Sequence, residues 1–234
     1  MREFFKIQLF KNLSFAYIAV VLFLAIVVLV NQNIVHEIIL RTLSLPLLMI
    51  LYYLVSPQRN IWYIMALIFA SISNVLFVFN DSLLLNYGLF AFLLFRVITI
   101  YLVLKATKKK SFFAIFVGSI FFLFPLLYFI ALTQDSLGQS FYISLVNVIL
   151  VSFLGGISLS NYLLEEGFKH TWLLLSTLLF AFLVFLFVIQ KYYLFIPVFQ
   201  PIRVLVLMAA HYFFMIYRVI HEREEQHHFL AKSQ

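Results

Sequence analysis

The sequence predicts an all-α membrane protein, an eight-transmembrane-helix bundle with its N- and C-termini in the cytoplasm. Of its 234 residues, 65% are hydrophobic and only 11% are charged, and its mean hydropathy is +1.09. An ordinary soluble domain is only about half apolar. The apolar residues form long continuous runs, which favours transmembrane helices over the alternating short segments of a membrane barrel.

Eight apolar runs are each long enough to cross a hydrocarbon core about 30 Å thick. The first run is followed by polar residues 31–33 rather than by the small residues of a signal-peptide cleavage site, so we expect it to stay as an anchor. Connections are short, and no linker divides the chain. We therefore expect one transmembrane domain over residues 1–220 and a short cytoplasmic tail over 221–234. The expected spans lie near residues 13–31, 37–55, 61–80, 83–104, 112–133, 141–163, 171–190 and 194–220.

Basic residues between the spans and at the ends of the spans gather on one side of the expected membrane. Loops on the other side hold only Lys191. Because Lys and Arg concentrate in cytoplasmic segments, and because the number of spans is even, this asymmetry predicts that both chain ends are cytoplasmic. The twelve residues on the cytoplasmic side are Arg2, Lys6, Lys11, Arg59, Lys105, Lys108, Lys109, Lys110, Lys169, Arg218, Arg223 and Lys232.

Composition and motifs exclude several kinds of chemistry. The chain has no Cys, so it has no disulfide, thiolate nucleophile or Cys-ligated metal. Its net charge of +7 is spread over five cytoplasmic segments, which indicates attraction to anionic lipid rather than nucleic-acid binding. No hydrolase elbow, zinc-protease or nucleotide-binding motif is present. We expect no cofactor and no metal, and we interpret His221, His227 and His228, with their neighbours Glu222 to Glu225, as a solvated helix.

Three arginines fall inside the expected spans, whereas the nine acids lie in loops, at span ends or in the tail. A charge inside a membrane costs about 3 kcal/mol or more, and it indicates a functional site when a partner can be named. Arg41 can pair with Glu37, one turn away, or extend to the outer headgroups. Arg96 lies near mid-depth and Arg203 in the outer third. An anionic headgroup held by guanidinium groups would supply the missing countercharge. The alternatives are freed backbone carbonyls for Arg96 and extension of the side chain to the outer headgroups for Arg203.

Other polar residues lie within the spans. Asn74, with Ser73 beside it, either contributes to a ligand site or bonds neighbouring helices together. His211 is either a proton relay or a hydrogen-bonded structural histidine. Gly155 and Gly156 indicate a face on which two helices pack closely. We assign no catalytic residue, and the candidate headgroup-binding residues are Asn74, Arg96, Arg203 and His211.

Three segments carry a resemblance to a known family. Residues 41–48 read RTLSLPLL, residues 70–77 read ASISNVLF, and residues 87–96 read YGLFAFLLFR. Together with eight spans and two internal chain ends, they resemble the YhhN, or lysoplasmalogenase-like, family of integral membrane proteins. Gly88 and Phe92 match that family's Gly-x-x-x-Phe-x-x-x-His pattern.

The chain departs from the family at its acidic positions. The resemblance implies an eight-helix fold with a lipid-shaped pocket and, in members that are enzymes, hydrolysis of the vinyl-ether bond of lysoplasmalogen. That reaction needs an acid to protonate the enol ether and a base to activate water. Here Asn74 replaces one family aspartate, residues 183–184 replace the other, and Arg96 replaces the histidine. Hydrolysis would require another acid to fold inward; Asp81 is the best placed, seven residues beyond Asn74 on one helical face, and Glu37 and Asp135 are the others.

Two interpretations follow. In the first, the chain is a YhhN-like membrane protein that binds a lysophospholipid-like amphiphile in an intramembrane pocket, with ether hydrolysis left open. In the second, it is a non-catalytic small-anion or lipid transporter, or a sensing bundle whose tail docks a protein partner. Under either, membrane lipids are the expected partners, an anionic lysophospholipid among them. We expect a multi-pass protein of the cell membrane, with a composition that fits a bacterial cytoplasmic membrane.

Overall fold

The computed structural model describes residues 2–31, 34–79, 81–109, 111–192 and 199–232, and these residues form helices and turns with no strand. The predicted all-helical class is confirmed. Each expected span corresponds to one long helix, and two short helical turns, α6 and η1, precede α7. In chain order the elements are α1 (Arg2–Asn31), α2 (Ile34–Val55), α3 (Ile61–Leu76), α4 (Ser82–Ala106), α5 (Phe112–Ala131), α6 (Gln134–Leu137), η1 (Gly138–Ser140), α7 (Phe141–Leu164), α8 (Lys169–Tyr192) and α9 (Phe199–Lys232).

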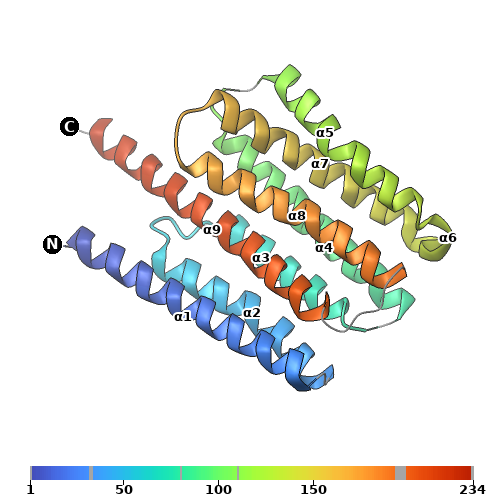
Figure 1. Ribbon diagram of the computed structural model, residues 1–234. Coiled ribbons are helices and arrows are strands. Elements are labelled where there is room, and N and C mark those ends of the chain that lie inside the picture. Colours follow the sequence, from blue (N-terminus) through green and yellow to red (C-terminus); the bar gives the residue numbers. More distant parts are fainter. Residues whose placement is uncertain (1, 32–33, 80, 110, 193–198, 233–234) are drawn as a thin grey trace.

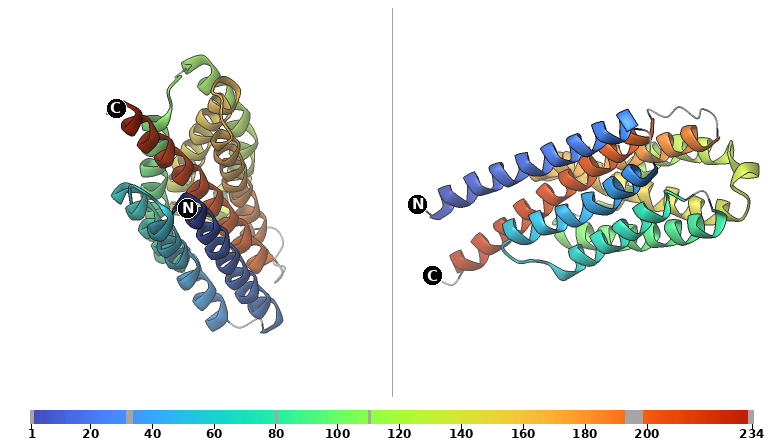
Figure 2. Two further views of the ribbon diagram at one scale, coloured as in Figure 1. Left: turned by 90° about the vertical axis from the view of Figure 1, so that its left-hand side faces the viewer. Right: turned by 90° about the horizontal axis from the view of Figure 1, so that it is seen from below.

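The helices pack side by side into one bundle (Figure 1). α9 packs against α8, α1 and α2, while α4 packs against α3 and α7. α1 and α2 form one flank of the bundle, and α5, packed on α7, forms the other (Figure 1). Both ends of the chain lie at the same end of the bundle (Figure 2). We call this the terminal end, and the end that carries the connections 77–79 and 132–140 the distal end.

Seven helices among the described residues are long and apolar enough to cross a membrane: α1, α2, α4, α5, α7, α8 and α9. Many of their large apolar side chains are exposed, as expected of residues that face lipid; Phe15, Phe112 and Phe113 are examples. The chain is therefore a polytopic helical membrane protein by fold. α3 is the shorter helix, with 16 residues. At about 1.5 Å per residue it is roughly 24 Å long, so the expected span 61–80 is longer than the helix that forms.

α9 continues through the boundary that we expected at residue 220. It is helical to Lys232, and the side chains of His221 and Glu222 are buried. The interpretation of Glu222 as part of a solvated helix is therefore wrong. Its carboxylate is enclosed because the end of α2 and the turn after it lie against this part of α9 and supply two hydrogen-bond donors, the hydroxyls of Tyr52 and Ser56. Beyond it, residues 225–227 are exposed.

Glycines allow α5 and α7 to approach closely, as expected for Gly155 and Gly156. A Cβ atom at Gly156 would overlap the hydroxyl of Ser119 and the carbonyl of Ile115, and one at Gly155 would overlap the ring of Phe122. Small residues at a helix contact are the usual means of close packing in membranes. This contact fixes α7, which carries part of the pocket described next.

Candidate functional site

A pocket lies inside the distal half of the bundle, between α2, α3, α4, α5, α7, α8 and α9. Its volume of about 90 Å³ accommodates several waters or one small anionic group. Four phenylalanines form much of its apolar wall: Phe77 directly after α3, Phe92 of α4, and Phe180 and Phe187 of α8. Its described lining contains no Asp, Glu or His. The polar residues of the lining are Arg41, Ser73, Asn74, Ser144, Asn147 and Arg203.

Arg41 and Asn74 connect α2 to α3 at one side of this pocket. The Asn74 amide donates to the Arg41 carbonyl at 3.1 Å, and Arg41 Nη1 donates to the Asn74 carbonyl at 3.5 Å. Asn74 thus bonds two helices together and also lines the pocket. Arg41 is only 2% exposed, so the prediction that it extends to the outer headgroups is wrong. The alternative pair with Glu37 involves a side chain outside those that the structure describes.

Arg203 enters the pocket from the other side. It lies near the start of α9, just after Pro201, which is tolerated in the first turn because its missing N–H has no helical acceptor there. The guanidinium carbon is 6.0 Å from the centre of the Phe187 ring, and the side chain is half-buried. Arg41 and Arg203 therefore place two guanidinium groups, from helices far apart in sequence, on one pocket.

Three polar groups of the lining have no hydrogen-bond partner among the described residues: the hydroxyls of Ser73 and Ser144, and Oδ1 of Asn147. The Asn147 amide nitrogen is used, since it donates to the carbonyls of Leu89 at 3.2 Å and Ile143 at 3.0 Å. Buried hydroxyl and amide groups are normally satisfied in folded proteins. Their placement around one cavity indicates water or a polar ligand.

Arg96 and His211 lie together in a different place. Neither lines the pocket, and both are fully buried. The Arg96 guanidinium carbon is 4.6 Å from the ring centres of both Phe92 and Phe180, and these two rings also line the pocket. Of the four sequence-predicted residues, Asn74 and Arg203 thus share the pocket, whereas Arg96 and His211 lie behind its aromatic wall.

Of the three expected sources of a carboxylate, Asp81 and Asp135 do not line the pocket, and the side chain of Glu37 lies outside those that the structure describes. Asp81 is exposed and caps α4, where it accepts from the backbone N–H groups of Leu83 and Leu84 at 2.9 Å. Asp135 is exposed in α6. Leu183 and Val184, the positions of the second family aspartate in the resemblance, both line the pocket. The described lining therefore offers positive charge and hydrogen bonds but no group for acid–base exchange at neutral pH.

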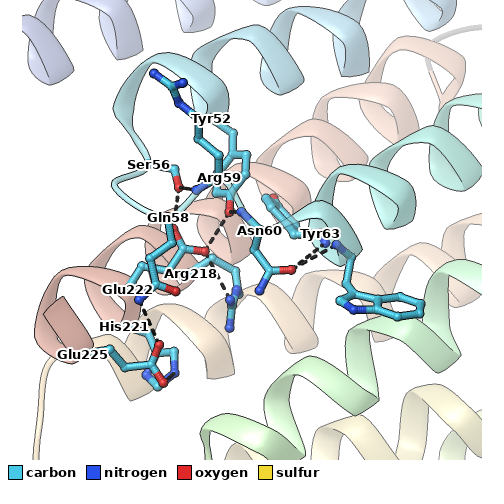
Figure 3. A network of polar contacts seen from close by, with 11 residues as sticks. Tyr52, Ser56, Gln58, Arg59, Asn60, Tyr63, Arg218, His221, Glu222 and Glu225 are labelled. Carbon is cyan, nitrogen blue, oxygen red and sulfur yellow. Dashed lines mark hydrogen bonds and ion pairs between the residues drawn. The ribbon is translucent and has the colours of Figure 1, made fainter. Parts of the chain in front are cut away.

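A second polar cluster, which was not predicted from the sequence, lies at the terminal end (Figure 3). Glu222 of α9 is fully buried and accepts from the Tyr52 hydroxyl at 2.7 Å and the Ser56 hydroxyl at 2.5 Å. Arg218, one turn earlier, donates to the same carboxylate at 3.1 Å. The Tyr52 oxygen in turn accepts from the backbone N–H of Asn60 at 2.9 Å.

Neighbouring carboxylates extend this attachment of α9. Glu224 pairs with Lys169 at the start of α8, and Glu225 accepts from Gln58 at 3.2 Å. Three glutamates of the tail, Glu222, Glu224 and Glu225, thus contact other parts of the same chain, whereas residues 226 and 227 are exposed. The cluster fastens α9 to α2, to the turn after α2 and to α8.

The described residues include no group of three or more His, Asp or Glu side chains placed to hold a metal ion. Fold and pocket together define a class: polytopic helical membrane proteins with a basic pocket buried in one half of the bundle. Comparison with models of known protein families, with curated proteins and with solved structures found no match for this chain.

Proposed function

We propose that this chain is a multi-pass protein of a bacterial cytoplasmic membrane, with eight spans and cytoplasmic ends, whose pocket binds the headgroup of an anionic, lysophospholipid-like amphiphile. One observation carries the proposal. Arg41 and Arg203 both line one buried pocket, together with polar groups of Ser73, Ser144 and Asn147 that have no hydrogen-bond partner among the described residues.

The chemistry of the lining suits a phosphate ester. Guanidinium groups bind phosphate oxygens through paired, charge-assisted hydrogen bonds. The hydroxyls of Ser73 and Ser144 are further donors, and Asn147 Oδ1 is an acceptor for a glycerol hydroxyl. Apolar side chains of α8 and α9, such as Val184 and Leu207, continue the lining beside the polar groups. An acyl chain attached to the headgroup would contact such a wall.

The proposal is for binding rather than for ether hydrolysis. Cleavage of a vinyl ether needs a proton donor at the enol carbon and a base for water. Asn74 and Val184 face the pocket where the YhhN resemblance places aspartates, and neither exchanges a proton. The two positions lie on one cavity, which supports a common architecture with that family, while their identities support a binding role.

Orientation is part of the proposal. The connections 56–60 and 165–168 lie at the terminal end with both chain ends, and this end carries the exposed residues Arg59 and Lys108. Positive charge favours the cytoplasmic side. The pocket then lies in the outer half of the membrane, within reach of a lipid from the outer leaflet.

A binding experiment with paired lipids tests the proposal. Detergent-purified protein is titrated with oleoyl lysophosphatidylglycerol and with monoolein, which has the same chain but no phosphate. We expect a clear preference for the phospholipid. Arg203→Gln should weaken that binding by roughly tenfold to a hundredfold, the usual range for one hydrogen bond to a charged group, and leave monoolein unaffected.

Arg59→Gln is the matched control, because Arg59 is exposed at the terminal end, far from the pocket. Its lipid affinities should equal those of the unmodified protein. Equal affinity for the two lipids, or unchanged phospholipid affinity in Arg203→Gln, would contradict the proposal.

A further inference from the structure

Arg96 is a fully buried guanidinium group that lies among aromatic rings. It has no exposed surface, and Nε, Nη1 and Nη2 all lack a hydrogen-bond partner among the described residues. Its recorded neighbours are aromatic rings: Phe92 and Phe180 at 4.6 Å and Phe95 at 5.9 Å. Rings attract a cation through their faces, but they do not accept the five N–H donors of a guanidinium as oxygen atoms do.

His211 adds a second unsatisfied group at the same place. It is fully buried, and neither ring nitrogen has a hydrogen-bond partner among the described residues. The described residues therefore do not give His211 the hydrogen bonds expected of a structural histidine. Its ring centre lies 4.9 Å from that of Phe95 and 5.0 Å from that of Phe180, two of the rings that surround Arg96. Two buried nitrogen-bearing side chains, from α4 and α9, thus share one aromatic enclosure.

A buried charge that lacks a partner is strongly unfavourable, so a group that accepts hydrogen bonds and carries negative charge is expected beside it. The aromatic rings around Arg96 restrict the size and shape of this group. A tetrahedral oxyanion needs donors on several sides, whereas Phe92, Phe95 and Phe180 offer none. A single-atom anion accepts N–H groups on one side only, so it fits among apolar rings that offer no donor.

We propose that Arg96 and His211 form an internal binding site for one monovalent anion of the halide class. The anion neutralises Arg96 and accepts hydrogen bonds from the guanidinium and from an imidazole N–H. It lies behind the rings of Phe92 and Phe180, which separate it from the pocket of Arg41 and Arg203. This site is independent of the lipid-binding proposal.

Equilibrium dialysis against radiolabelled chloride tests the site. The full-length protein, purified in detergent, is held at constant ionic strength with sodium gluconate while chloride is varied. We expect saturable binding of one chloride per chain. Arg96→Gln should abolish it, and His211→Phe, which keeps the shape of the ring but removes both nitrogens, should weaken it by about tenfold.

Arg203→Gln separates the two proposals. If both proposals are correct, this variant should lose lysophosphatidylglycerol affinity and keep chloride binding. Loss of chloride binding in this variant would place the anion in the pocket of Arg41 and Arg203 and would overturn the internal site. Absence of saturable chloride binding in the unmodified protein would show that the enclosure holds water only, and would also overturn it.

Folding is monitored by gel filtration and helical circular dichroism. If Arg96→Gln does not give folded protein, the chloride affinity of His211→Phe tests the site instead, because this variant leaves the charge of Arg96 in place. Unchanged chloride affinity in folded His211→Phe would contradict the proposed site.

Discussion

A single carboxylate illustrates how position decides the role of a residue. Glu222 belongs to a run of charged residues, 222–225, that by composition is typical of a solvated helix. In the fold it is fully buried, whereas Glu225 three residues later is exposed. The difference arises from the turn after α2, which lies over one face of α9 and presents Ser56 to it. A sequence pattern on α9 alone does not contain that information.

At this scale we predict that Glu222→Gln destabilises the protein by about 3 kcal/mol, since it leaves the buried guanidinium of Arg218 without its counterion. Reversible unfolding in mixed detergent and SDS measures the change. Glu225→Gln is the control, because its exposed carboxylate should contribute less than about 1 kcal/mol. Equal effects of the two substitutions would contradict the assigned role of Glu222.

Residue types predicted the candidate site in part. Arginine inside an apolar run is rare enough to identify Arg96 and Arg203 as candidates, and an amide in a span did the same for Asn74. The sequence alone did not show which of these residues lie together in the fold. Arg41 is a pocket residue because α2 lies against α3, and Arg96 is excluded from the pocket because two phenylalanine rings lie between.

At the scale of elements, the helices themselves followed from hydropathy. Apolar runs predicted α4, α5, α7 and α8 to within about two residues at each end, since apolar length and turn residues both mark these boundaries. α3 is shorter than expected because the chain turns at residues 77–79, although the apolar run continues through them. α9 is longer than expected because tertiary contacts of Glu222 and Glu224 stabilise a segment with little apolar character.

The contact between α5 and α7 gives the second prediction. Gly156→Val should destabilise the bundle by about 2 kcal/mol, since the added atoms overlap the Ile115 carbonyl, which belongs to the backbone and cannot rotate away. The same SDS unfolding assay measures it. Val117→Ala, on the exposed face of α5, is the control and should change stability little. A stable Gly156→Val protein would mean that α5 and α7 are further apart than described.

At the scale of the whole molecule, the two chain ends lie at one end of the bundle (Figure 2). The connections that carry the exposed residues Arg59 and Lys108 lie at the same end. Charge asymmetry and helix number predicted this arrangement from sequence alone. Which side of a membrane this end faces is a separate matter, and it is open to experiment because the chain has no Cys. A single introduced cysteine reports its own side.

We predict that Asp135→Cys, in α6 at the distal end, reacts with a membrane-impermeant maleimide in intact cells. Lys109→Cys, in the exposed connection between α4 and α5, should react only after lysis. Both positions are exposed, so reactivity in lysed cells serves as the internal control for each. Labelling of Lys109→Cys in intact cells, with Asp135→Cys protected, would reverse the orientation and place the pocket in the inner half of the membrane.

The central claim is that Arg41 and Arg203 hold the phosphate of an anionic amphiphile. An experimental structure of the purified protein with lysophosphatidylglycerol tests it most directly. We expect the phosphate in the pocket, within hydrogen-bonding distance of both guanidinium groups, with the acyl chain along α8 or α9. Lipid found only on the outer surface of the bundle, with water in the pocket between the two arginines, would contradict it.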